Sequence, residues 1–248
     1  SNNTKTIKDI IEGKHNLSSK IENSKKPLII IGHSVLNLKS GKYVFEEIKK
    51  YLTSINKITD EWNSLNILSK DASTVGSNDL NIISSSDLQN VTLTRTLNNE
   101  FEVIFLIGQD NLKFKKKNEF VIYIGSHGDS GAECADIILP GSTYTEQDGY
   151  FTNLEGKVQK AYKASYPPGD AKEDWEIINN LSELLKRKKI FNNKDELVDS
   201  MFNYLNLKKE NIINELIDEN FVDEKITVHN TDYYFSNVIA RSSKTMID

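Results

Sequence analysis

Short apolar runs that end beside a glycine recur along the chain and predict a parallel β-sheet. The runs are Leu28–Ile31 before Gly32, Glu102–Gly108 (EVIFLIG) and Phe120–Gly125 (FVIYIG). Strands that are covered on both faces are almost uniformly apolar, so these runs are typical of buried strands. Ile137–Leu139 is predicted to be a fourth strand, which Pro140-Gly141 ends. Because the strands alternate with helical patterns, we expect an α/β fold with a parallel sheet flanked by helices.

The spacing of apolar residues also predicts helices in the first half of the chain. One amphipathic helix is expected over residues 42–57, where apolar side chains recur at helical spacing: Tyr43, Val44, Ile48, Tyr51, Leu52 and Ile55. A short helix is indicated after it by Trp62, Leu65, Leu68 and Ala72. Residues 73–99 are rich in Ser, Asn, Thr and Asp, so we predict a long loop with at most one brief element.

Turn-forming residues divide the second half of the chain. Asn153–Gly156 is predicted to be the turn of a β-hairpin. After the break at Pro167-Pro168-Gly169, Asp170 is expected to cap a helix that carries Trp175, Ile178, Leu181 and Leu185. Later elements are predicted as helices over 195–206 and 209–219, a strand over Ile226–His229 and an extended tail over 230–248.

These patterns predict three parts of the chain. Residues 1–26 are polar apart from a short stripe of isoleucines, so we expect an N-terminal arm that packs against another surface. Residues 27–190 form the predicted α/β domain, and residues 191–248 a helical extension with a docking tail. The tail carries three consecutive aromatic residues, Tyr233, Tyr234 and Phe235. We expect them to dock onto the same domain or onto a neighbouring subunit, because tails are disordered unless they are docked.

Composition excludes several classes of function. The 248 residues include 36 acidic and 31 basic side chains, a net charge of −5, so no basic face for nucleic acid is expected. A membrane-spanning helix needs about 20 apolar residues, and no run approaches that length, so we predict no membrane span. Cys134 is the only cysteine. It therefore cannot form an intrachain disulfide, and an iron–sulfur cluster held by four thiolates is excluded within this chain.

A polar, glycine-containing loop after a predicted strand supplies the candidate site. Gly125, His127 and Asp129 lie in this loop, and Asp136 follows nearby. In open α/β sheets ligands bind at the carboxyl ends of the strands, where exposed backbone amides can hold a phosphate. The alternative is a glycine-rich turn with an incidental polar cluster, which we favour because no recognised phosphate-binding motif accompanies the loop. His127, Glu133, Cys134 and Asp136 match no standard metal-ligand spacing, so neither a metal site nor a catalytic site is predicted.

Residues 120–175 carry a set of motifs in an order that is typical of one family. The motifs are GSHGDSG (Gly125–Gly131), ADIILPG (Ala135–Gly141), Tyr144-Thr145-Glu146, NLEGKVQ (Asn153–Gln159), Pro167–Gly169 and Asp174-Trp175. In these motifs the chain resembles the molybdopterin-oxidoreductase-like domain of the large iron–sulfur subunit of respiratory complex I. The region 28–68 and the tail segment Tyr233–Met246 (YYFSNVIARSSKTM) are similar to that family too.

The resemblance implies a Rossmann-like domain within a proton-translocating NADH:ubiquinone oxidoreductase. In catalytic members of the wider superfamily the segment around ADIILP helps to hold a pterin–nucleotide cofactor, whereas the complex I branch is regarded as non-catalytic. We therefore expect no cofactor here, and treat Gly125, His127, Asp129 and Asp136 as a vestigial cleft. The cysteine-rich iron–sulfur half of the family pattern is absent, so the chain is expected to be a carboxyl-terminal half, split or cleaved from it.

The resemblance also implies partners and a location. The partners are the other subunits of the complex I peripheral arm, above all a separate N-terminal iron–sulfur half. The location is the matrix side of the mitochondrial inner membrane, or the cytoplasmic side of the plasma membrane in a bacterium. Two other functions stay open: half of a split molybdopterin-dependent oxidoreductase, and a stand-alone module that binds a small ligand.

Overall fold

The computed structural model describes residues 2–36, 38–69, 71–82, 91–208, 220–227 and 234–247. The chain forms two compact units, which are described one at a time. The first unit holds the described residues up to Val75, the segment Thr152–Lys157 and residues 220–227. The second holds the described residues of Gly76–Phe151, residues 158–208 and residues 234–247. The division at residues 26 and 190 that the sequence suggests stays a prediction.

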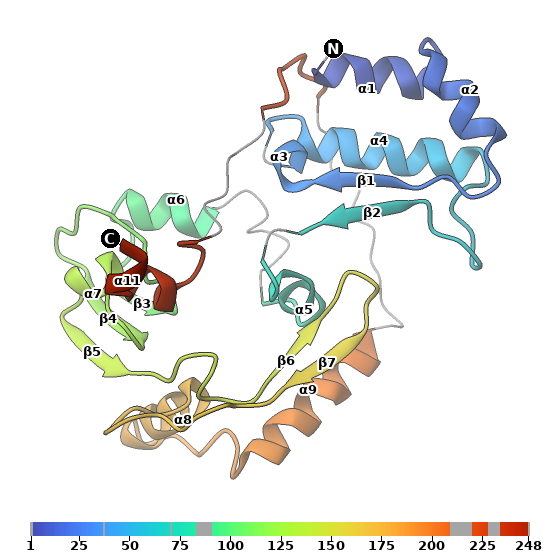
Figure 1. Cartoon of the computed structure of the whole chain (residues 1–248). Helices are drawn as coiled ribbons and strands as arrows, with labels where there is room; N and C mark the ends of the chain where they lie inside the picture. Colours follow the sequence, from blue (N-terminus) through green and yellow to red (C-terminus); the bar gives the residue numbers. More distant parts are fainter. Residues whose placement is uncertain are drawn as a thin grey trace. The chain divides into compact units, whose positions relative to one another are not determined.

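The first unit is built around a βαβ arrangement (Figure 1). Its elements are α1 (Thr4–Ile11), α2 (Asn16–Asn23), β1 (Ile29–Gly32), α3 (His33–Leu36), α4 (Gly41–Ser54) and β2 (Leu65–Leu68). β1 and β2 are parallel, and their register places Ile29 beside Leu65 and Gly32 beside Leu68. Parallel neighbours need a crossover connection, which α4 supplies. The predicted strand at 28–31 and the predicted helix at 42–57 are both confirmed.

The core of this unit lies between the two strands and α4. Its buried side chains are Ile31, Val44, Ile48, Tyr51, Leu52 and Leu65. Ile7 and Ile11 of α1 and Ile21 of α2 are partly buried against the same core. The isoleucines of the predicted N-terminal arm thus complete a hydrophobic core within the unit.

Residues 220–227 belong to the first unit although they lie far along the chain. The Thr4 hydroxyl is fully buried and donates to the carbonyl of Val222 at 2.7 Å. The Phe221 ring lies 5.7 Å from the ring of Tyr43, centroid to centroid. The carboxylate of Glu224 accepts hydrogen bonds from both the backbone N–H and the hydroxyl of buried Ser40. Polar groups buried in this way are satisfied by a segment more than 180 residues away.

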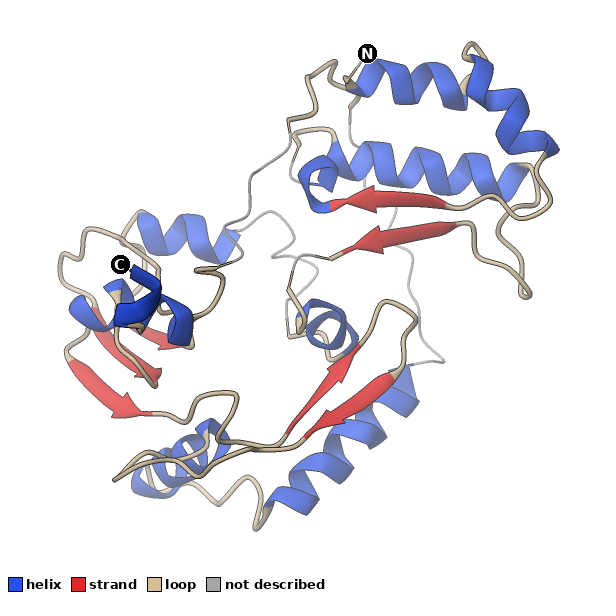
Figure 2. Cartoon of the chain, viewed as in Figure 1, coloured by secondary structure: helices blue, strands red, loops and turns tan. Residues whose placement is uncertain are grey.

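The second unit contains a parallel sheet of three strands in the order β3-β4-β5 (Figure 2). The strands are β3 (Val103–Ile107), β4 (Phe120–Gly125) and β5 (Ile137–Pro140). The buried side chains Ile104, Leu106, Val121 and Tyr123 form a core on one face of this sheet. All three strands were predicted from the apolar runs. Together with β1 and β2, they confirm the predicted α/β class with parallel sheets.

The remaining elements are further helices and a hairpin. They are α5 (Thr74–Asp79), α6 (Val91–Leu97), α7 (Ser130–Glu133), β6 (Gly149–Thr152), β7 (Val158–Ala161), α8 (Asp174–Leu184), α9 (Lys194–Lys208), α10 (Val238–Ser242) and α11 (Lys244–Ile247). The hairpin turn is confirmed, since the Asn153 side chain accepts the backbone N–H groups of Glu155 and Lys157. No helix within the described ranges is long and apolar enough to cross a membrane.

Two predictions in the first half were wrong. Residues 65–68 form strand β2 and not a helix, because Leu65 joins the core that contains α4 while the backbone pairs with β1. The predicted loop over 73–99 contains two helices, α5 and α6. The helix α6 is rich in threonine, a poor helix former, and its Thr96 is buried against the unit, so tertiary packing outweighs propensity.

Three predictions in the second half also change. The helix α8 begins at Asp174, and its N-cap is Glu173 instead of Asp170. The predicted strand at 226–229 is absent at 226 and 227, and 228 and 229 lie outside the described residues; a single bridge joins the preceding residue, Lys225, to Asn3. The tail is helical over α10 and α11 and not extended, because the Asn237 side chain caps α10. The helix predicted over 195–206 is confirmed as α9, whereas 209–219 lies outside the described residues.

Candidate functional site

The carboxyl edge of the β3-β4-β5 sheet is where the candidate loop lies. Gly125 ends β4, and a methyl group at its Cα would collide with the phenol of Tyr123. The Tyr123 side chain is 1% exposed, and its hydroxyl donates a hydrogen bond to Asp110. Burial, followed by the carboxylate of Asp110, raises the pKa of Tyr123, so this phenol stays neutral. Gly125 therefore makes room for a tyrosine and serves packing at this edge.

Asp129 is the centre of a charged network at the same edge. Its carboxylate accepts the backbone N–H of Ser130 at 2.8 Å, which caps the four-residue helix α7. The other oxygen lies 3.1 Å from Nε of Arg241, whose Nη2 is 3.9 Å from the carboxylate of Asp110. The Ser130 N–H first, and Arg241 as well, hold the pKa of Asp129 below its usual value. This carboxylate therefore stabilises the folded state at neutral pH, and the contribution is lost as the pH falls through the folded pKa.

Helix α10, the second-last helix of the chain's described part, lies against this edge. Arg241 belongs to α10 and lies 112 residues along the chain from Asp129. A cavity of about 380 Å³ lies beside the network and is lined by Gly128, Asp129, Phe235, Arg241 and Ser242. The expectation that tail aromatics dock onto the same domain thus holds for Phe235. Tyr234 is 72% exposed, and Tyr233 lies outside the described residues.

The structure does not bring all four candidate residues together. His127 lies in the loop after Gly125, where its Nδ1 is 2.8 Å from the hydroxyl of Ser126. Asp136 lies at the opposite end of the strands, because its carboxylate accepts the backbone N–H of Val121 near the start of β4. The carboxylate also lies 2.5 Å from Nζ of Lys116, and this bond lowers its pKa. Gly125, His127 and Asp129 share the carboxyl edge, and Asp136 is separate from it.

Metal-ligating side chains are dispersed around the loop. Cys134 is half-buried, its Sγ lies 3.2 Å from the carbonyl of Gly131, and burial raises the pKa of its thiol. A thiol with a raised pKa is a weak nucleophile and a weak metal ligand. Within the described ranges, no three His, Cys, Asp or Glu side chains come together in a way that could hold a metal ion.

Asp174 is a carboxyl group of the same edge that the sequence analysis named as part of a family motif but not as a site residue. Burial first, then the carboxylates of Glu173 and Asp110, raise its pKa. A methyl group at Gly141 would lie 2.8 Å from its Oδ1, so the end of β5 packs directly on it. Ser142 and Thr143 follow, and their buried hydroxyls have no hydrogen-bond partner in the described part of the chain. The edge thus gathers three carboxyl groups: Asp110 and Asp129 lie beside Arg241, and Asp174 lies near Asp110.

Replacing Asp174 with asparagine is expected to stabilise the protein at neutral pH. A carboxyl group whose pKa is raised in the folded state binds its proton more tightly there than in the unfolded chain. The free energy of unfolding therefore falls as the pH rises from about 4, the unfolded value, through the folded pKa. We expect Asp174→Asn to add about 1 kcal/mol at pH 7, a scale common for stabilising substitutions, and little at pH 3. Urea unfolding at both pH values measures this; a loss of stability at pH 7 would contradict it.

Replacing Arg241 with methionine is expected to destabilise the second unit by about 1–2 kcal/mol. The loss of stability should lie between that of an exposed ion pair and that of a buried ion pair, because the Arg241 side chain is 24% exposed. Its removal leaves the carboxylates of Asp110 and Asp129 without this cation. The control is Lys50→Met, which breaks a pair with Glu47 at 2.7 Å whose lysine is 59% exposed. Urea midpoints of the two variants give the comparison, and equal losses would show that Arg241 acts as an ordinary surface residue.

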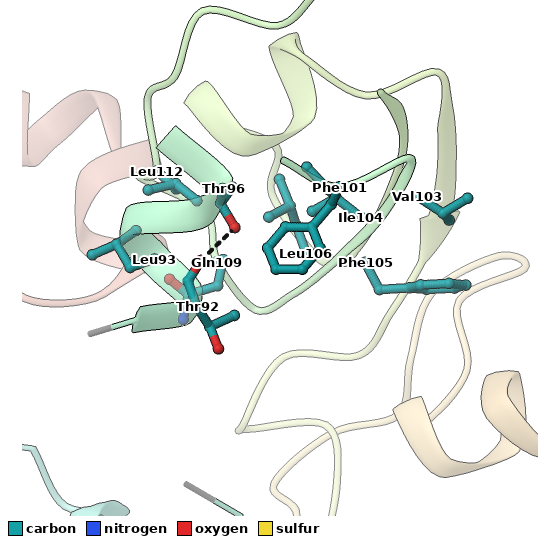
Figure 3. Close-up of a pocket in the computed structure, with 10 residues that line it drawn as sticks. All are labelled: Thr92, Leu93, Thr96, Phe101, Val103, Ile104, Phe105, Leu106, Gln109 and Leu112. Carbon is teal, nitrogen blue, oxygen red and sulfur yellow. Dashed lines mark hydrogen bonds between the residues drawn. The ribbon is translucent and has the colours of Figure 1, made fainter. Parts of the chain in front are cut away.

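Two larger cavities lie elsewhere in the second unit. One of about 460 Å³ lies between α6 and the outer strand β3, and none of the ten lining residues drawn in Figure 3 is ionisable. The hydroxyl of the buried Thr96 in this cavity already donates a hydrogen bond to the carbonyl of Thr92 at 2.9 Å. The other, of about 490 Å³, is lined by Trp175 and by the apolar side of α9, and its Lys194 is paired with Glu173.

Sequence reasoning missed Asp110, Tyr123, Asp174 and Arg241. Asp110 could have been found, because it follows Gly108 at the carboxyl end of a predicted strand, as His127 follows Gly125. Arg241 carries no such signal, since its role depends on how a distant tail returns to the sheet.

The chain is similar along almost its whole length to parts of larger proteins. It is 38% identical to the NADH-ubiquinone oxidoreductase 75 kDa subunit of Reclinomonas americana over 256 residues. It is 36% identical to an NADH-quinone oxidoreductase subunit of Rickettsia felis, and 32% identical to the mitochondrial NADH-ubiquinone oxidoreductase 78 kDa subunit of Candida albicans. These matches cover 98–99% of this chain but only 35–37% of each relative.

A family model covers most of the same region. The model described as molybdopterin oxidoreductase matches residues 1–184, which include both parallel sheets, the candidate loop and the hairpin. The resemblance read from the motifs between Gly125 and Trp175 is confirmed by this match and by the relatives. The chain therefore belongs to the molybdopterin oxidoreductase family.

Proposed function

We propose that this chain is a structural, non-redox part of the peripheral arm of complex I. It supports electron transfer from NADH to ubiquinone by the assembled complex and carries no electrons itself. The observation that carries the proposal is the similarity of 98–99% of the chain to subunits named for NADH-quinone or NADH-ubiquinone oxidoreductase. Its partners are other complex I subunits, above all a polypeptide that supplies the rest of the relatives' length. Its place is the matrix side of the mitochondrial inner membrane, or the cytoplasmic side of the plasma membrane in a bacterium.

The chemistry of the sheet edge supports a role without a pterin cofactor. A pterin–nucleotide carries phosphate, which needs free N–H donors or cations. The Ser130 N–H and the Arg241 guanidinium at this edge are already bonded to Asp129. The other charged groups here, Asp110 and Asp174, are carboxyl groups that would repel phosphate. These residues do not fit the cofactor that the family name implies, so no reaction step is assigned to it.

Purification through a tag on this chain tests the proposal. The native assembly is isolated in mild detergent, its proteins are identified and quantified by mass spectrometry, and its metals are measured. We expect complex I subunits in stoichiometric amounts, including a cysteine-rich iron–sulfur polypeptide, with iron but no molybdenum. Recovery of the chain with a molybdenum-containing partner would favour the split oxidoreductase instead. Recovery of the chain alone, with tight nucleotide binding, would favour a ligand-binding module.

The variant Arg241→Met adds a test of the closed sheet edge. If the tail has a structural role, this variant should retain fewer partner subunits than the Lys50→Met control. If the edge is instead a ligand site that holds phosphate through Arg241, the variant should lower the affinity for a nucleotide such as GTP. Isothermal titration of both variants with GTP separates the two outcomes.

A further inference from the structure

The end of helix α8 presents apolar and basic side chains together on the surface. Leu184 is 81% exposed, Leu185 is 65% exposed and Ile190 is 54% exposed. Between them lie four consecutive cations, Lys186–Lys189. Residues 184–190 are called the α8 loop below. Exposed leucines are ordinary one at a time, but three aliphatic side chains beside four cations form a local surface of mixed character.

The backbone of the α8 loop is fixed by hydrogen bonds at its start. The N–H of Lys186 donates to the carbonyl of Glu183 at 2.9 Å, and the N–H of Arg187 donates to the carbonyl of Ser182 at 2.9 Å. These two bonds are the pattern of a Schellman motif, in which the residue after the helix end is left-handed. Lys186 has φ +57°, the conformation that glycine usually supplies at that position. The helix end therefore has a defined turn.

A buried asparagine fixes the far end of the same loop. The Asn179 side chain is 5% exposed, and its oxygen accepts the backbone N–H groups of Ile190 and Phe191 at 3.0 and 3.2 Å. Its amide also donates to the carbonyl of Phe191. The Ser182 hydroxyl donates to the carbonyl of Lys188 at 2.8 Å, in the middle of the loop. These hydrogen bonds from Asn179 and Ser182 thus fix the backbone of the loop, while its apolar and basic side chains are exposed to solvent.

Among the residues that the structure describes, few carboxylates compensate the cations of the loop. The Nζ of Lys189 lies 3.7 Å from the carboxylate of Glu183, but both side chains are 48% exposed, so the pair contributes little. Cations near the end of a helix are stabilised by its dipole, which accounts for part of the basic run. The dipole gives no reason for exposing Leu184, Leu185 and Ile190 beside them. A partner that is both acidic and apolar would satisfy both features.

We propose that the α8 loop docks onto an acidic face of another protein subunit, with the three aliphatic side chains at the centre of the contact. The occupant follows from charge complementarity: four cations require carboxylates, and desolvated aliphatic side chains require an apolar partner surface. A protein is favoured over a lipid surface because the loop is held rigid by Asn179 and Ser182. Rigidity lowers the entropy lost in a shape-specific contact, whereas a fluid headgroup layer does not need it. This inference deepens the structural role proposed above and rests on it.

A zero-length carbodiimide crosslink tests the contact directly. The reagent joins a lysine amine to a carboxylate that touches it, so the native assembly from the tagged full-length chain is treated and digested. We expect crosslinks from Lys186, Lys188 or Lys189 to Asp or Glu residues of one partner subunit. These lysines should also be protected from acetylation in the assembly relative to the purified chain. Lysines that react equally in both, without a crosslink, would overturn the proposal.

Charge reversal tests whether the α8 loop itself binds the partner, or whether any basic run on the same unit would do so. Lys188→Glu together with Lys189→Glu should reduce the retained partner subunit at least tenfold at physiological salt. The control is Lys113→Glu with Lys115→Glu, two exposed lysines of another basic run in the same unit, which should retain the partner. Leu184→Ser removes a side chain that is 81% exposed, so its effect on the fold should be small, and it should also reduce retention. Equal retention in all variants would overturn the proposal.

The outcomes distinguish this inference from the proposed function. Complex I subunits that are recovered without any crosslink from the α8 loop leave the function standing and overturn the loop's role. A stoichiometric partner from outside complex I that is crosslinked through these lysines overturns the function and supports the loop's role. Sedimentation of the assembly with phosphatidylserine vesicles, abolished by the double charge reversal, would assign the loop to lipid and overturn the protein contact. Recovery of no stoichiometric partner overturns both proposals.

Discussion

Replacing Tyr123 with alanine is expected to cost the protein about 4 kcal/mol of unfolding free energy, the range of large-to-small substitutions at buried aromatic residues. Tyr123 is 1% exposed and lies in the middle of β4, packed with Ile104, Leu106 and Val121. Its loss would leave a cavity under the carboxyl edge and free the carboxylate of Asp110. Urea unfolding followed by near-ultraviolet circular dichroism measures the change.

The matched variant Tyr123→Phe separates the contribution of the ring to stability from that of the hydroxyl. It keeps the packing and removes only the donor to Asp110, so we expect a loss of about 1 kcal/mol, typical of one hydrogen bond. A loss in Tyr123→Phe as large as in Tyr123→Ala would show that the bond to Asp110, and not the core, holds this edge together. A loss below about 1 kcal/mol in both would contradict the burial of the side chain.

Replacing Gly131 with alanine is expected to cost about 3 kcal/mol, at the upper end of ordinary overpacking. Its new methyl group would meet the backbone carbonyl of Gln109, which cannot move aside as a flexible side chain can. The Gly131 N–H also donates to the carbonyl of Asp110 at 2.8 Å, so the loop after β3 rests on α7 at this residue. We expect the substitution to displace Asp110 from Arg241, and thermal unfolding to show a lower midpoint.

Gly149→Ala is the control for that substitution. Its methyl group would lie 3.6 Å from the ring of Phe151, an ordinary contact, and Gly149 has no left-handed backbone. We expect a change within about 0.5 kcal/mol, as for surface substitutions without special contacts. Similar losses at Gly131 and Gly149 would mean that the approach of α7 to the loop after β3 is looser than the structure indicates.

The sequence by itself determined four of the parallel strands, β1, β3, β4 and β5, and the family. Apolar runs such as Phe120–Gly125 predict strands because a strand covered on both faces has no place for polar residues. The helix at Gly41–Ser54 was predicted for a similar reason, since its apolar side chains recur at helical spacing. The lone cysteine, visible in the sequence, limits the cofactors that this chain can hold. Each of these signals is local, or depends on the presence of a residue anywhere in the chain.

Only the tertiary structure decided which residues form the edge of the sheet and how that edge is closed. Residues 65–68 form a strand and not a helix because β1 pairs with them. The local sequence of these four residues does not indicate that pairing. Asp136 is not part of the candidate cleft, because the direction of β5 places it at the amino end of the sheet. Arg241 is part of the carboxyl edge because the tail folds back onto Asp129. Such long-range contacts depend on the summed packing of the whole unit, so no local pattern specifies them.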